Sequence, residues 1–181
     1  MNAPQQEHAG DDFHRRTEEF EEQGVQRRLG GRALQLITAV ALAFSAYQLV
    51  VAAFHPLSSL VTRSLHVGFL LLLTLLVYPH RSQGKAAHHI PWFDYALAIA
   101  AFGLAAYHWV FEADLIQRAG DPSTIDLVVG SVFTLLLFEA SRRVMGKALP
   151  LLCASFLLYG LFGQYLPEAV AHRGYGFDQI V

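Results

Sequence analysis

The chain has 181 residues, of which 54% are hydrophobic and 15% charged, and its formal net charge is −2. A soluble domain usually carries roughly a quarter charged residues, so this composition disfavours one. The basic residues lie at the ends of apolar runs, which argues against a nucleic-acid partner, and the single cysteine, Cys153, excludes a disulfide within the chain or a CxxC metal pair.

The first 32 residues are polar and contain four clustered glutamates followed by arginines. We predict a cytoplasmic polar arm, residues 1–32, whose helical content the sequence leaves open. This segment does not read as a secretory signal peptide, because the first apolar run is too long for such a signal and no A-x-A site follows it.

Five apolar segments follow the arm. A hydrocarbon core of about 30 Å needs about 20 residues at 1.5 Å per residue, and the run from Ala33 to Phe54 contains no Asp, Glu, Lys, Arg or His. Backbone groups in hydrocarbon must pair within their own segment, which favours helices, and the alternating pattern of membrane strands is not seen. The predicted fold class is all-α, a polytopic helical membrane protein. The expected spans are residues 33–54, 59–78, 93–111, 125–144 and 148–165.

The loops between these spans alternate between basic and non-basic. Cytoplasmic loops of membrane proteins carry an excess of Lys and Arg, so the N-terminus is expected in the cytoplasm and the region after the fifth span outside. The loops on the other side contain one base, Arg118. The bases on the cytoplasmic side are Arg27, Arg28, Arg32, Arg81, Lys85, Arg142, Arg143 and Lys147.

The fourth span opens and closes with informative polar residues. Ser123 and Asp126 have the spacing of a capping box, with Asp in place of Glu. At the other end, Glu139 precedes Arg142 and Arg143 by three and four residues, so all three can meet on one helix face.

The charged segment between the fourth and fifth spans predicts a cytoplasmic hairpin. An unpaired carboxylate near the membrane would be costly, whereas a paired one at the interface costs little. The role assigned to these residues is structural and topological, and a functional ion pair at a subunit contact is the alternative. The residues are Glu139, Arg142, Arg143 and Lys147.

Four motifs follow one another in residues 115–181: TIDLVVG preceded by an R-x-G, EASRRVMGKALP, YGLFGQYLP and HRGY. In order and spacing they resemble the N-terminal part of fused permeases of the tripartite ATP-independent periplasmic (TRAP) transporters, the branch that works with TAXI-type binding proteins. The first half of the chain resembles this family only in its pattern of spans.

The resemblance implies a division of labour. Residues 33–144 would be a four-helix bundle similar to the small membrane subunit, and residues 145–181 would hold a fifth, linking helix and the start of a large-subunit region. Sodium coupling and solute binding are expected in that large region, so this chain is expected to hold no cofactor and not to transport alone. It would serve as a membrane scaffold for uptake of a solute such as an organic acid.

The resemblance also implies partners and a location. The expected partners are the TRAP large membrane subunit, fused or separate, a periplasmic TAXI-type solute-binding protein and the lipid bilayer. The expected location is the inner membrane of a bacterial cell.

A few polar residues inside the spans are candidates for other roles. Arg63 and His66 lie one turn apart on the second span and are candidate contacts to a partner. The alternative is an arginine that reaches the headgroups and a histidine hydrogen-bonded to a neighbouring helix. Asp94, at the entrance to the third span, is expected at the interface.

Two other functions remain open from the sequence. His66 and His108 could be axial ligands of a haem in a small membrane redox subunit, or the chain could stabilise another membrane complex. No Ser-His-Asp set, phosphate-binding glycine loop or zinc motif is recognisable, so we predict no enzymatic activity, and no catalytic or metal-binding residue.

Overall fold

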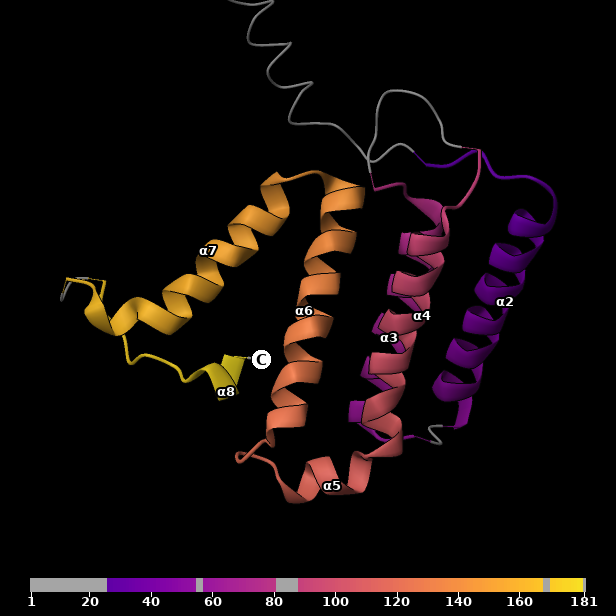
Figure 1. The fold of residues 1–181 in the computed structure, drawn as a ribbon. Helices are drawn as coiled ribbons and strands as arrows, with labels where there is room; N and C mark the ends of the chain where they lie inside the picture. The colour runs from indigo at the N-terminus through magenta and orange to yellow at the C-terminus, as the bar shows by residue number, and fades with distance from the viewer. Residues whose placement is uncertain (1–25, 55–56, 81–87, 168–169, 181) are drawn as a thin grey trace, which may run out of the picture.

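The computed structural model describes residues 26–54, 57–80, 88–167 and 170–180, and these form helices without any strand (Figure 1). Five helices in this part of the chain are long and apolar enough to cross a membrane, which confirms a polytopic, membrane-embedded helical protein. They are α2 (Gly31–Phe54), α3 (Ser59–Val77), α4 (Trp92–Val110), α6 (Thr124–Met145) and α7 (Ala148–Phe162), the last continued by the 3-10 turn η1 (Gly163–Tyr165).

The helix ends agree with the predicted spans to within three residues. Proline and glycine account for several of them: Pro79 follows α3, and Gly146, with φ of 72°, ends α6 before Pro150 enters the first turn of α7. Two short helices were not predicted, α5 (Glu112–Gln117) and α8 (Phe177–Ile180). Segments this short carry too little periodicity to be recognised in a sequence.

Helices α2, α3, α4 and α6 form a bundle in which α3 is central. α3 packs against α2, α4 and α6, and α6 also packs against α4. α7 packs along α6 and then slants away from the bundle, as Figure 1 shows. The buried apolar cluster lies between α3, α4 and α6. Its members include Leu71, Leu75, Ala98, Ala101, Leu136 and Ala140.

The α3–α4 contact is unusually close because small residues face each other. A Cβ added to Gly68 would collide with the Cβ of Ala105, and Phe102 closes the same site. The hydroxyl of Ser64 donates to the carbonyl of Ala105 at 2.8 Å. Small residues and interhelical hydrogen bonds are the usual means of packing helices in lipid.

Helices α2 and α7, all of whose residues the structure describes, contain no buried residue. Large apolar side chains point outward from both, for example Leu49 at 72% and Leu151 at 73% exposed. Such surfaces would be unfavourable in water but are solvated by lipid tails or covered by apolar partners in a membrane. The exposure pattern therefore agrees with the membrane assignment.

At the end of the bundle where α5 lies, Asp126 joins three segments. It forms the predicted capping box with Ser123, whose backbone N–H donates to Asp126 at 2.8 Å. It also accepts hydrogen bonds from the Tyr107 hydroxyl at 2.6 Å and from Arg118 at 3.3 Å. The end of α4, the α5 segment and the start of α6 are thus held at one carboxylate.

Candidate functional site at the arginine-rich end of the bundle

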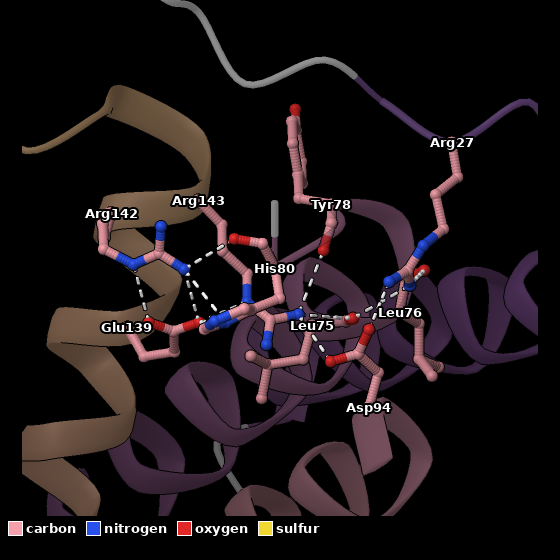
Figure 2. A network of polar contacts seen from close by, with 9 residues as sticks. All are labelled: Arg27, Leu75, Leu76, Tyr78, His80, Asp94, Glu139, Arg142 and Arg143. Carbon is pink, nitrogen blue, oxygen red and sulfur yellow. Dashed lines mark hydrogen bonds and ion pairs between the residues drawn. The ribbon is translucent and has the colours of Figure 1, made fainter. Parts of the chain in front are cut away.

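The opposite end of the bundle holds a cluster of charged side chains, shown in Figure 2. The side chains come from the segment before α2, from the residues just after α3, from the start of α4 and from the last turns of α6, and they point toward one another. We call this set the charge cluster. Its members are Arg27, His80, Asp94, Glu139, Arg142 and Arg143.

Asp94 is the centre of the charge cluster and is completely buried. One carboxylate oxygen forms an ion pair with Arg27, and the other lies 2.9 Å from Nη1 of Arg143. Both arginine side chains are at most 1% exposed. A buried charge without a partner is strongly destabilising, and here one carboxylate serves two guanidinium groups.

Glu139 extends the charge cluster toward the surface. Its carboxylate accepts a hydrogen bond from Nε of Arg143 at 2.8 Å and two from Arg142, at 2.8 and 2.9 Å. The ring Nδ1 of His80 lies 2.8 Å from the same carboxylate. The spacing of three and four residues along α6 therefore brings the predicted side chains together. Positive and negative groups alternate from Arg27 to Arg142, with three guanidinium groups and two carboxylates.

The charge cluster also satisfies the end of α3. The last four carbonyls of a helix lack partners within the helix, and the C-terminus carries partial negative charge. Arg27 and Arg143 donate to these carbonyls, which places their surplus positive charge where the helix dipole favours it. The carbonyl of Thr74 accepts from the backbone N–H of Tyr78 at 2.9 Å, and the arginines serve the other three carbonyls. Leu75 O accepts from Nη1 of both Arg27 and Arg143, at 3.3 Å each. Leu76 O accepts from Nη1 of Arg27 at 2.7 Å, and Val77 O accepts from the backbone N–H of Arg27 at 2.9 Å.

No protein family model, curated protein or solved structure matches this chain. The carboxylates and guanidinium groups of the charge cluster are directed at one another and at backbone carbonyls, an arrangement that holds four chain segments together at one end of the bundle.

The sequence analysis did not identify Arg27 and Asp94 as members of this site. Arg27 was placed in the polar arm, but it is buried, while residues 1–25 of that arm lie outside the described residues. Asp94 lies in the first turn of α4, at the end of the span, and its burial within the protein was not predicted. One signal in the sequence could have pointed to this pair. Asp94 is an acid in the first turn of an apolar span, on the same predicted side of the membrane as most of the arginines, and such an acid needs a basic partner.

The remaining candidate residues lie apart from the charge cluster. His66 contacts the side chain of Gln48 and packs edge-on against Phe44, both on α2, so the expected hydrogen bond to a neighbouring helix is present. Arg63 is exposed and lines a groove on the flank of the bundle. Lys147 is exposed between α6 and α7.

The two histidines considered as haem ligands face different neighbours. His66 faces α2, whereas His108 bonds the carbonyl of Leu104 in its own helix at 3.2 Å and lies beside Phe133 of α6. The structure thus gives the pair no shared site. Within the described residues, no group of three or more His, Cys, Asp or Glu side chains could hold a metal ion.

Two of the motifs behind the family resemblance meet at the end of α7. The backbone N–H groups of His172 and Tyr175 donate to the carbonyls of Gly163 and Gly160, at 3.3 and 3.1 Å. The hydroxyl of Tyr159 donates to the backbone carbonyl of Val170 at 2.9 Å. A Cβ on Gly163 would collide with the His172 ring. The segments YGLFGQYLP and HRGY therefore pack against each other at the end of α7.

Proposed function

We propose that this chain is the scaffold and linker part of a TRAP transporter permease in a bacterial inner membrane, with its N-terminus in the cytoplasm. The bundle of α2, α3, α4 and α6 would be the small-subunit-like scaffold, and α7 would lead to the large subunit. The observation that carries the proposal is the contrast between a bundle closed at one end by the buried charge cluster and a fifth helix, α7, that slants away from this bundle and contributes no residue to the cluster (Figure 1).

The charges favour one orientation for this scaffold. The end that contains the charge cluster would lie in the cytoplasm by the positive-inside rule, and the end that contains α5 would lie outside. There it could approach a TAXI-type binding protein that delivers a solute such as an organic acid. The sodium and solute sites would belong to the large subunit, so the role of this chain would be to anchor and orient that subunit.

Co-purification tests this proposal. The tagged chain, co-expressed with the large TRAP subunit encoded next to it or in frame with it, should retain that subunit in mild detergent. Replacing two outward residues of α7, Leu151 and Phe156, by alanine should reduce the retained amount several-fold, because these side chains are 73% and 66% exposed and free to meet a partner.

The matched control is an alanine pair on α2, at Leu42 and Leu49, which are 66% and 72% exposed. This pair should leave retention unchanged. The proposal fails if the large subunit is never retained, or if the α2 and α7 pairs reduce retention equally.

A further inference from the structure

An apolar groove of about 410 Å³ lies on the flank of the bundle between α3, α4 and α6. It is separate from the charge cluster, since none of its lining residues belongs to that set. The residues that line it are Leu60, Arg63, Ser64, Val67, His108 and Phe133.

The groove runs inward from the membrane surface. Arg63 and Val67 lie four and eight residues after the start of α3 at Ser59, which corresponds to depths of about 6 and 12 Å at the rise of an α-helix. His108 is two residues from the end of α4, whereas Phe133 is nine residues into α6, at a depth of about 14 Å. Half of a hydrocarbon core is about 15 Å. The mouth of the groove is thus polar and its floor, near the bilayer centre, is apolar.

Arg63 is the charged group at this mouth. Its side chain is exposed, and within the described ranges it forms no ion pair or hydrogen bond. An arginine at this depth is costly unless its long side chain reaches water or the headgroup region, where the lipid phosphates lie. The planar guanidinium matches a phosphate geometrically and electrostatically.

We propose that the groove binds one phospholipid, with the headgroup phosphate on Arg63 and one acyl chain packed along Val67 and Phe133. The charged mouth of the groove lies toward the lipid headgroups, and its apolar floor lies at the depth of the acyl chains. The two parts of the groove therefore match the two parts of a phospholipid. The proposal does not depend on the transporter assignment, because it uses only the membrane location and the geometry of the groove.

Native mass spectrometry of the delipidated chain, titrated with phosphatidylglycerol in mild detergent, tests the proposal. The wild-type chain should bind one lipid saturably. Arg63→Gln should weaken this binding at least about tenfold, as expected for loss of a charge-assisted contact, and Arg63→Lys should retain part of it. Val67→Phe keeps the arginine but fills the groove, and it should also weaken lipid binding. If Arg63→Gln does not fold, the lipid binding of Val67→Phe tests the proposal in its place.

The matched control is Arg32→Gln, a change at an exposed arginine near the start of α2 that lies outside the groove. Its lipid binding should equal that of the wild type. Equal binding by Arg63→Gln and wild type would overturn the proposal, as would equal losses in Arg63→Gln and Arg32→Gln. Competition by glycerol phosphate as effective as that by the lipid would show that the acyl chain contributes nothing, and would also overturn it.

Discussion

Replacing Asp94 by asparagine is expected to destabilise the bundle by about 3–5 kcal/mol, the usual cost of removing one partner from a buried ion pair. Asparagine keeps the shape of the side chain but removes the charge between Arg27 and Arg143, whose side chains are at most 1% exposed. Arg143 retains Glu139, whereas Arg27 loses its one ion-pair partner among the described residues. The free energy of unfolding can be measured by SDS titration in mixed micelles, followed by the loss of helical circular dichroism.

The matched control is Asp121→Asn, which removes an acid from an exposed position in the loop before α6. Its effect should stay within about 0.5 kcal/mol, as is usual for surface substitutions. In the double variant Asp94→Asn with Arg27→Gln, the free energy of unfolding should fall by less than the sum of the decreases in the two single variants, because the two residues form one ion pair. Similar stabilities for Asp94→Asn and Asp121→Asn would show that the charge cluster does not hold the bundle together.

Gly68→Ala is expected to destabilise the protein by about 1–3 kcal/mol, the range found when a methyl group is forced into a packed interior. The added Cβ would collide with the Cβ of Ala105, which is fixed to the backbone of α4, so the two helices would have to separate. That movement would also lengthen the 2.8 Å hydrogen bond from Ser64 to the Ala105 carbonyl. The same SDS titration measures the loss.

Gly103→Ala is the matched control, since Gly103 also lies in a membrane helix but has open space where its Cβ would be. Alanine is favoured over glycine inside a helix by up to about 1 kcal/mol, so this variant should be as stable as the wild type or slightly more stable. If both alanine variants changed stability equally, the close α3–α4 contact would not be a source of stability.

The features that sequence analysis predicted correctly depend on local spacing. The spans follow from the apolar runs and from prolines such as Pro79. The capping box of Ser123 and Asp126 and the pairing of Glu139 with two arginines follow from positions three and four residues apart on one helix. Each of these requires only that the segment be helical.

The features that were missed depend on tertiary contacts. Arg27 and Asp94 are 67 residues apart in the chain. They meet because the segment before α2 is hydrogen-bonded to the end of α3 and α3 packs against α4. Alternation of charged loops placed the arginines on one side of the membrane, but it could not show which of them would be buried. The α3–α4 contact at Gly68 is equally invisible in the sequence, because several small residues of α4 could have faced it.

In the orientation that we propose, the helices cross the membrane in alternating directions and the charge cluster lies on the cytoplasmic side. Single cysteines at His89 and Asp121, both exposed and at opposite ends of the bundle, test this in a Cys153→Ser background, where no other cysteine remains. In intact cells a membrane-impermeant maleimide should label the cysteine at position 121, and it should label the one at position 89 only after permeabilisation. Equal labelling of both positions in intact cells would contradict the claim.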